Sequence, residues 1–468
     1  MNQQVKIDAI VSLIESFPAA FNHLNLAGNR EFIDWFMPRL DALRESDFWD
    51  EKVIEEIQTR RLQNLLSYLQ QTSPFWKQRL DAFGIRPESA SILKDLKLLP
   101  VTDYELFAEE KGAYAIPRGE PQPVIHTRYS SGTTGRNKMI LISDPEISLD
   151  ILSCLFRKPI FDAVAIRKML ERKFFLFLGR TVLPHYASFA SSFPLDNYTR
   201  LSDPDTRNEI YRILKTSPQI LWAFSSIAYE FAHYRLVDDS PPSPLLAIYI
   251  HSESSTCEEK LFIKNTFNVP VVHLYISCET AIIGDECSSY FGYGYYHIPR
   301  ERTIIEIVDE NGSPVNDHQE GRIVVTILDR KITPIIRYAN GDRGKFPKIT
   351  CACGKKSPLL EVRGREGENI KLPSGKTFSA LLFASIFLDA VSLKTVSQYQ
   401  IQQESLKEII IRVVPAAESL KSREIAAIEL LLSSTVGKGV SARIVHVESI
   451  PREPSGKMRF FVPLKKNE

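Results

Sequence analysis

The sequence predicts an α/β protein with a large N-terminal part and a small α+β C-terminal domain. Short apolar runs alternate with helical segments through much of the chain, which is typical of α/β proteins with largely parallel sheets. The pattern becomes barrel-like near residue 303 and changes again after residue 364. Because 468 residues exceed what one domain usually contains, we divide the chain into residues 1–365 and residues 366–468.

Residues 1–95 are expected to be mostly helical. In Glu51–Leu69 the apolar residues stand at positions 54, 57, 62, 65, 66 and 69, which is the spacing of one helix face. Strand-like segments begin only around Val124. The N-terminal part is therefore predicted to begin with a helical subdomain.

The middle of the chain is predicted to form a largely parallel sheet. Three apolar or β-branched runs predict strands, at Phe174–Leu178, Leu246–His251 and Val271–Ile276. Helical segments, Asp205–Thr216 and Cys257–Phe267, lie between them. Strands that alternate with helices in this way favour parallel pairing.

Two further patterns follow toward the C-terminus. From Thr303 the chain reads as strand, turn, strand, with Asn311-Gly312 as the turn, and continues as an antiparallel or barrel-like section. After Gly364 the elements of a small α+β domain follow in the order helix, strand, strand, helix, strand: Phe378–Leu388, Val396–Gln402, Glu408–Val414, Ser422–Ser433 and Ala442–His446.

The composition excludes several classes of protein. With 58 Lys and Arg against 57 Asp and Glu, a net charge of +1 gives no reason to expect nucleic-acid or acidic-membrane binding. The longest apolar runs, such as Leu381–Leu388, are too short for a membrane span. Asp8 and Glu15 interrupt the apolar N-terminal stretch, which is unlike a signal peptide. We therefore expect a cytoplasmic protein whose six cysteines form no disulfide framework.

A glycine- and hydroxyl-rich loop follows a strand-like segment at residues 129–138, YSSGTTGRNK. Its glycines let backbone N–H groups form an anion nest, and its hydroxyls add donors without bulk. A solvated loop of the same composition is the alternative, and Lys138 after the second glycine favours phosphate binding. The expected contacts are Ser130, Ser131, Gly132, Thr133, Thr134, Gly135 and Lys138.

The loop SSGTTGRNK resembles the phosphate loop of the adenylate-forming (acyl- and aryl-CoA synthetase, ANL) superfamily. Further segments match that family in the same order: Tyr275–Glu279 (YISCE), Arg337-Tyr338 with Gly341-Asp342, Gly364-Arg365 and Pro454–Lys457 (PSGK). The stretches SPFWKQRLDAFGI and CACGKKSPLLEVRGR are similar to its phenylacetate–CoA ligase branch. Together these motifs run from about residue 55 to the end of the chain.

The resemblance implies a two-step reaction. A carboxylic acid attacks the α-phosphate of ATP, which gives an acyl-adenylate and pyrophosphate, and a thiol then displaces AMP. Lys457 and Glu279 would be the catalytic residues, with Glu279 as the Mg²⁺ ligand. Asp342 would bind the ribose hydroxyls and Arg365 the ribose or phosphate. Ser252, Glu253 and Tyr275 complete the residues that the resemblance places at ATP or AMP.

Some residues depart from the family pattern. Cys278 stands where the family usually has a threonine, and a thiol is a weak substitute for a phosphate-binding hydroxyl. The acidic hinge residue after Arg365 could be Glu366 or Glu368. By resemblance the C-terminal domain, residues 366–468, is mobile and turns between the two half-reactions, so the departure at the hinge concerns the second one.

Four residues have the composition of a structural zinc site. Cys351 and Cys353 form a CxC turn, and Cys287 and His297 lie ten residues apart upstream. Three thiolates and one imidazole suit tetrahedral Zn²⁺, and the phenylacetate–CoA ligase branch resembles this arrangement. The alternative is a set of unpaired buried cysteines and a surface histidine.

The resemblance leads to an AMP-forming carboxylate ligase of biosynthetic type that uses ATP and Mg²⁺, with coenzyme A as the expected co-substrate. Two alternatives stay open, an enzyme that loads an acyl carrier protein and a catalytically degenerate member of the family. The acid cannot be identified, but an aryl or small acyl group fits the residues chosen for its pocket: Tyr186, Ala223, Phe224, Ser277 and Cys278. A homodimer also stays open, whereas nucleic-acid and membrane partners are not expected.

Overall fold

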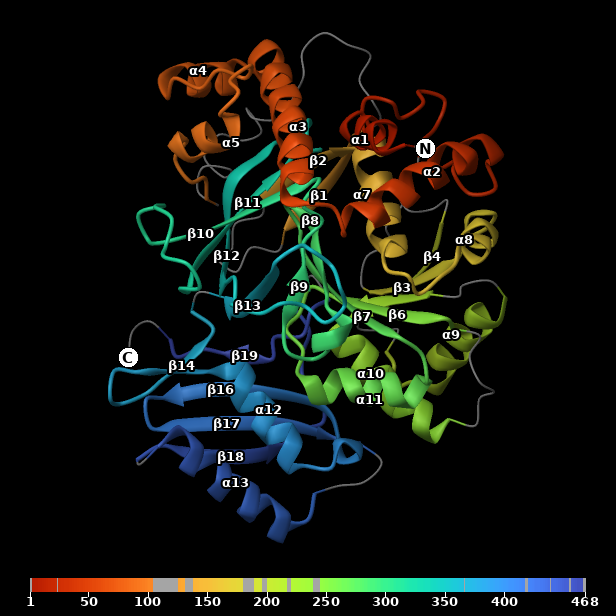
Figure 1. Cartoon of the computed structure of the whole chain (residues 1–468). Helices are drawn as coiled ribbons and strands as arrows, with labels where there is room; N and C mark the ends of the chain where they lie inside the picture. The colour runs from red at the N-terminus through yellow and green to blue at the C-terminus, as the bar shows by residue number, and fades with distance from the viewer. Residues whose placement is uncertain are drawn as a thin grey trace.

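The computed structural model (Figure 1) describes most of the chain. The described residues are 2–22, 24–103, 125–130, 138–179, 189–195, 200–216, 220–238, 245–365, 367–416, 420–437, 439–453 and 456–465. Among them no helix is long and apolar enough to span a bilayer.

The N-terminal region is helical, as the spacing of its apolar residues predicted. Its longest helix, α3, buries the same face that the sequence indicated, including Ile54, Ile57 and Leu62. Asn2, Asn29 and Ser73 cap α1, α2 and α4. The helices are α1 (Gln3–Val11), α2 (Arg30–Ser46), α3 (Glu51–Thr72), α4 (Pro74–Ala82) and α5 (Ile92–Asp95), followed by the 3₁₀ turn η1 (Leu96–Leu98).

The described strands include one large mixed sheet, in the order β10-β11-β12-β13-β9-β8-β7-β6-β5-β3-β4. Five strands of one half run parallel. They are β3 (Phe175–Gly179), β4 (Ala190–Pro194), β5 (Ile220–Phe224), β6 (Ala247–His251) and β7 (Val271–Ser277). The strands β3, β5 and β6 are buried at every position, which explains why they read as continuous apolar runs.

Helices alternate with these strands. They are α7 (Asp144–Arg157), α8 (Ala163–Leu170), α9 (Pro204–Thr216), α10 (Ser225–Val237) and α11 (Cys257–Phe267). The bounds of α11 equal the predicted ones because Thr256 and Glu259 form a capping box at its N-terminus and Asn268 ends it in the left-handed conformation. The α/β class with a largely parallel half is thus confirmed.

The barrel-like section is the antiparallel half of the same sheet and not a separate one. It joins the parallel half where β7 pairs with β8. Its strands are β8 (Ala281–Glu286), β9 (Tyr295–His297), β10 (Thr303–Val308), β11 (Gly321–Ile327), β12 (Ile335–Lys345) and β13 (Leu359–Arg365). The strand expected after Asn311-Gly312 is reduced to one bridge between Val308 and Pro314, since proline has no N–H to extend a ladder.

A separate hairpin precedes α7. The strands β1 (Ile125–Ser130) and β2 (Lys138–Ser143) pair antiparallel, and Ser130 lies opposite Lys138. The backbone therefore brings together the two ends of the segment 131–137.

The C-terminal residues have a hydrophobic core of their own, which Phe383, Phe387 and Ile401 help to form. Their four-stranded sheet has the order β18-β17-β16-β19 and packs against two helices. The elements are β14 (Asn369–Lys371), β15 (Thr377–Ser379), α12 (Ala380–Ala390), η4 (Leu393–Thr395), β16 (Val396–Ser405), β17 (Glu408–Pro415), α13 (Ser422–Val436), β18 (Ser441–His446) and β19 (Phe461–Val462). The predicted α+β order is present.

The C-terminal domain lies beside α10 and α11 (Figure 1). The Tyr229 hydroxyl of α10 donates to the Val396 carbonyl at 2.9 Å. The Ser385 hydroxyl of α12 donates to the Glu258 carboxylate of α11 at 2.8 Å.

Candidate active site

Three side chains from three strands converge on the carboxylate of Asp342. The Tyr275 hydroxyl, on β7, donates to Oδ2 of Asp342 at 2.6 Å. The amide of Asn340, on β12, donates to the same oxygen at 2.9 Å and to the Tyr275 oxygen at 2.6 Å. Arg365 ends β13 with Nε 3.5 Å from Oδ1 of Asp342. Burial, and next the Asp342 charge, hold the pKa of Tyr275 well above its ordinary value, so Tyr275 stays a donor.

Strand pairing sets up this convergence. Asp342 and Arg365 are direct partners in the β12–β13 ladder. Sequence reasoning named Tyr275, Asp342 and Arg365 but missed Asn340. The signal for Asn340 was its position inside the matched segment, between Tyr338 and Asp342.

Glu279 is buried in the turn that links β7 and β8, with 7 % of its surface exposed. The Tyr338 hydroxyl, on β12, donates to its Oε1 at 3.2 Å. Burial, together with the Glu279 charge and hydrogen bond, raises the pKa of Tyr338. Cys278 is half-buried, and its thiol acts electrostatically on Tyr338. The predicted catalytic acid is therefore shielded from solvent and lies next to a phenol donor.

Arg337 of the same segment is structural. Its backbone has a φ of 46°, its Nε bonds Glu306 at 3.0 Å, and its Nη1 donates to the carbonyl of Lys97 at 2.9 Å. The two residues of the matched Arg-Tyr pair thus have different roles. Arg337 attaches the η1 turn to the sheet, and Tyr338 bonds Glu279.

The segment around Lys457 lies against the C-terminal end of β6 and the N-terminal end of α10. The Met458 N–H donates to Oε1 of Glu253 at 2.7 Å, and the Ser226 N–H donates to Oε2 at 2.8 Å. Burial, and next the Lys457 charge, lower the pKa of His251 to about 3. Lys457 is therefore close enough to His251, at the end of β6, to act on it electrostatically. Pro454 and Ser455 lie outside the described residues.

Residues expected to form the acid pocket occupy the ends of β5 and β7, the two strands that flank β6. Ala223 and Phe224 end β5 and are buried, and the Phe224 ring lies 5.1 Å from the His251 ring. The Ser252 hydroxyl lies 2.7 Å from Nδ1 of His251. Ser277, half-buried, bonds Thr280 through its hydroxyl at 2.9 Å. Tyr186 lies outside the described residues.

The predicted phosphate loop falls largely in a segment that the structure does not describe. Ser130 and Lys138 are described through their backbones alone, as the end of β1 and the start of β2. The hinge candidate Glu366 also lies outside the described residues, as do the remaining loop residues Ser131, Gly132, Thr133, Thr134 and Gly135.

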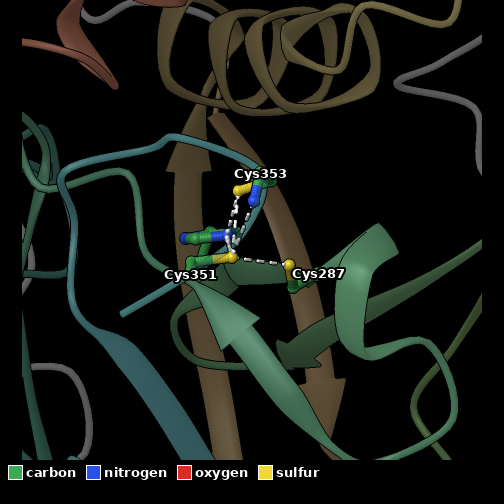
Figure 2. A group of neighbouring side chains, drawn as sticks. Cys287, Cys351 and Cys353 are labelled. Atoms are coloured by element: carbon green, nitrogen blue, oxygen red, sulfur yellow. Dashed lines mark hydrogen bonds between the residues drawn. The ribbon is translucent and has the colours of Figure 1, made fainter. Parts of the chain in front are cut away.

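The four predicted metal ligands come together (Figure 2). Their ligand atoms all lie within 4.8 Å of one another. The Cys351 sulfur is 3.2 Å from that of Cys287 and 3.1 Å from that of Cys353. His297 Nε2 lies 3.1 Å from the Cys353 sulfur, and its Nδ1 lies 3.0 Å from the Ser357 hydroxyl. The sequence alternative of a surface histidine is wrong, because His297 is 2 % exposed.

The ligand atoms of these four residues have the chemistry of a structural metal site. Three sulfurs and one imidazole nitrogen are soft and borderline ligands of the kind that zinc binds in closed four-coordinate sites. Ser357 fixes the orientation of the imidazole from the outside, as outer-shell partners of metal ligands usually do. The residues present therefore fit zinc.

Comparisons with known proteins agree with this geometry. Residues 373–463 match the family model described as the CapK C-terminal domain. A phenylacetate–coenzyme A ligase of Thermus thermophilus is 23% identical over 466 aligned positions, and the alignment covers 92% of this chain and 100% of that protein. A phenylacetate–coenzyme A ligase of Escherichia coli is 21% identical over 450 aligned positions, and the alignment covers 87% of this chain and 94% of that protein.

Solved structures of 2-hydroxyisobutyryl-CoA ligase share the fold. In the postadenylation state with 2-HIB-AMP the TM-score is 0.66 at 17% identity, covering 96% of this chain and 94% of that one. In the thioesterification state with 2-HIB-AMP and CoA the TM-score is 0.57 at 18% identity, covering 96% of both chains. The resemblance is confirmed: the chain is similar to phenylacetate–CoA ligases along almost its whole length and has the fold of adenylate-forming acyl-CoA ligases.

Proposed function

We propose that this protein is an AMP-forming acid–thiol ligase that converts a carboxylic acid to its acyl-adenylate and then to a CoA thioester. The main support is the convergence of Tyr275, Asn340 and Arg365 on Asp342, with Glu279 near enough to act electrostatically on Arg365. The curated relatives with which it shares most of its length are named phenylacetate–coenzyme A ligases. An aryl or small acyl acid is the substrate class that we infer.

The nucleotide would bind where the carboxylate of Asp342 is held in place. A carboxylate accepts from both hydroxyls of a ribose, and Tyr275 and Asn340 orient it before the nucleotide arrives. Arg365 balances the Asp342 charge and offers its remaining donors to ribose or phosphate. Ser252 and Glu253 are further proposed neighbours of the nucleotide.

The first step brings a carboxylate to a polyanion, so it depends on charge neutralisation and orientation. Glu279 would hold Mg²⁺, which neutralises phosphate charge when bound. The acid oxygen bonds the α-phosphorus as the bond to pyrophosphate breaks, and Lys457 would contact both the acid and the phosphate oxygens. The thiol sulfur of CoA then attacks the acyl carbon, loses its proton and expels AMP.

Exchange of labelled pyrophosphate into ATP, with a panel of aryl and small aliphatic acids, tests the first step. We expect exchange with at least one acid, and acyl-CoA formation when CoA is added. Lys457→Ala should abolish exchange, whereas Lys407→Ala, at an exposed turn of the same domain, should leave it unchanged. Absence of exchange with every acid would refute the proposal, and exchange without acyl-CoA would instead favour a carrier-protein acceptor.

We also propose that Cys287, His297, Cys351 and Cys353 bind one structural Zn²⁺. Their donor set and proximity support it. Elemental analysis should find about one zinc per chain. Cys353→Ser should lose most of this zinc, whereas Cys257→Ser, at a cysteine outside the cluster, should retain it. A metal-free wild type purified without chelators would refute the site.

A further inference from the structure

The segment that carries Lys457 is fixed at both ends to its own domain. The Ile401 N–H of β16 donates to the Phe460 carbonyl at 2.7 Å, and the Gln400 amide donates to the Arg459 carbonyl at 2.8 Å. At the other end, the Ile450 N–H donates to the Gln398 side chain at 3.3 Å. Lys457 therefore projects from a loop whose ends belong to the C-terminal sheet.

The middle of this loop is attached to the large domain instead. Nη1 of Arg452 donates to the Ser226 hydroxyl at 2.7 Å, and its Nη2 lies 2.9 Å from the Glu230 carboxylate. Ser226 and Glu230 are on the first turns of α10. Nη1 of Arg452 also reaches the Gly456 carbonyl at 3.3 Å, directly before Lys457. One guanidinium thus joins α10 to the residue preceding the lysine.

A second attachment lies directly after the lysine. The carboxylate of Glu253 is half-buried, and its two oxygens accept one N–H from the loop, that of Met458, and one from α10, that of Ser226. Burial raises the pKa of Glu253, and the Arg452 charge opposes this effect. Lys457 is therefore held on one side through Gly456 and on the other side through Met458.

We propose that Arg452 and Glu253 are positioning residues that clamp the Lys457 loop onto α10 for the acid-activating step. This inference rests on the proposed function. The arrangement of the chain agrees with it, since the fold match is better to the postadenylation state of 2-hydroxyisobutyryl-CoA ligase than to its thioesterification state. Glu253 then acts through the backbone of the lysine loop, in addition to any contact with nucleotide.

The clamp makes a specific demand on side-chain chemistry. A planar guanidinium can reach Ser226, Glu230 and Gly456 together, whereas a lysine ammonium at position 452 is a point charge that satisfies them less well. A carboxylate at position 253 accepts both N–H groups, whereas a glutamine accepts with one end only and presents an N–H₂ to the other donor. Arg452→Ala, Arg452→Lys and Glu253→Gln therefore form a graded series.

Hydrogen exchange tests the clamp without reference to activity. In the unliganded full-length protein the Met458 amide should exchange at least about 10-fold faster in Arg452→Ala and in Glu253→Gln than in wild type. The matched control is Arg207→Ala, which removes another partly buried ion pair, with Asp238, in the large domain. Unchanged exchange at Met458 in both clamp variants, or an equal rise in the control, would overturn the proposal.

Kinetics of the two half-reactions test whether the clamp supports the acid-activating step. With phenylacetate as the probe acid, Arg452→Ala should lower pyrophosphate exchange by about 100-fold through kcat, because small misplacement of a reacting group has effects of this size. Arg452→Lys should recover part of that loss. Thioester formation from supplied phenylacetyl-adenylate and CoA should stay within about 3-fold of wild type.

The outcomes separate the two proposals. Equal losses in both half-reactions, with a lower melting temperature, would show a merely structural role and overturn the clamp. If wild type catalyses no pyrophosphate exchange with any acid, the proposed function fails. Hydrogen exchange of the Met458 amide still decides whether Arg452 and Glu253 hold the loop.

Discussion

Glu259 is a buried acid between the two domains, and its replacement by glutamine should change how stability depends on pH. Its Oε2 accepts from the Thr256 N–H at 2.8 Å and from the Ser255 hydroxyl at 3.1 Å. Tyr399, on β16 of the C-terminal domain, also bonds this carboxyl. Burial raises the pKa of Glu259 from 4.5 to about 7, although these hydrogen bonds oppose the rise.

The sign and size of the effect follow from linkage. The folded protein keeps the Glu259 proton up to about pH 7, whereas the unfolded chain loses it near pH 4.5. This contribution to stability is therefore fully present below about pH 4.5 and is lost as the pH rises to about 7. Because one pKa unit corresponds to about 1.4 kcal/mol, the loss is about 3 kcal/mol. Glu259→Gln should abolish it, because glutamine does not titrate, while its amide oxygen still accepts from Thr256 and Ser255.

Urea unfolding of wild type and Glu259→Gln between pH 4.5 and pH 8 measures this contribution. Burial lowers the pKa of His233 to about 4 and that of His251 to about 3, so these groups favour folding as the pH rises through the unfolded value. Wild type and Glu259→Gln both contain these two histidines. The difference between their free energies of unfolding therefore isolates Glu259. Wild type should lose about 3 kcal/mol relative to the variant between pH 4.5 and pH 7. Parallel curves, or a difference of opposite sign, would refute the reasoning.

Three other predictions test the site and the core. Tyr275→Phe removes the donor to Asp342 and should raise KM for ATP by about 10-fold with kcat within about 3-fold, as steady-state kinetics would show; an unchanged KM would contradict this role. Arg157→Met leaves two buried carboxylates without their shared guanidinium and should lower the free energy of unfolding by about 3–5 kcal/mol in urea titrations; a loss below about 1 kcal/mol would contradict it. A strong chelator should lower the melting temperature of wild type but not that of Cys353→Ser in calorimetry, and equal shifts would argue against the metal site.

The elements that the sequence predicted well are those whose signals are local. The helix Cys257–Phe267 has a capping box at one end and an asparagine at the other, so both bounds can be read without the rest of the chain. The strands β3, β5 and β6 also have a local signal, because they are buried at every position and therefore form short apolar runs. Family-like motifs then located Tyr275, Glu279 and Asp342 in sequence order.

Features that depend on long-range pairing could not be predicted. The strand β9 has three residues, too few for a periodic signal, yet it joins β8 to β13 and makes the sheet continuous. Glu253 and Met458 meet across 205 positions of the chain. Nothing local in PREPSGK indicates that Arg452 contacts α10, because an arginine in such a loop is usually a solvated surface residue.

The proposed metal site and the nucleotide site are connected through one strand. Cys351 and Cys353 lie in the loop that leads into β13, and His297 is the ladder partner of Leu359, where β13 begins. Six residues later Arg365 is paired with Asp342. Because side chains alternate between the faces of a strand, a slip of one residue in β13 would turn Arg365 away from Asp342. A metal bound to His297 and to the incoming loop would therefore fix the register on which the proposed ribose-binding role of Asp342 depends.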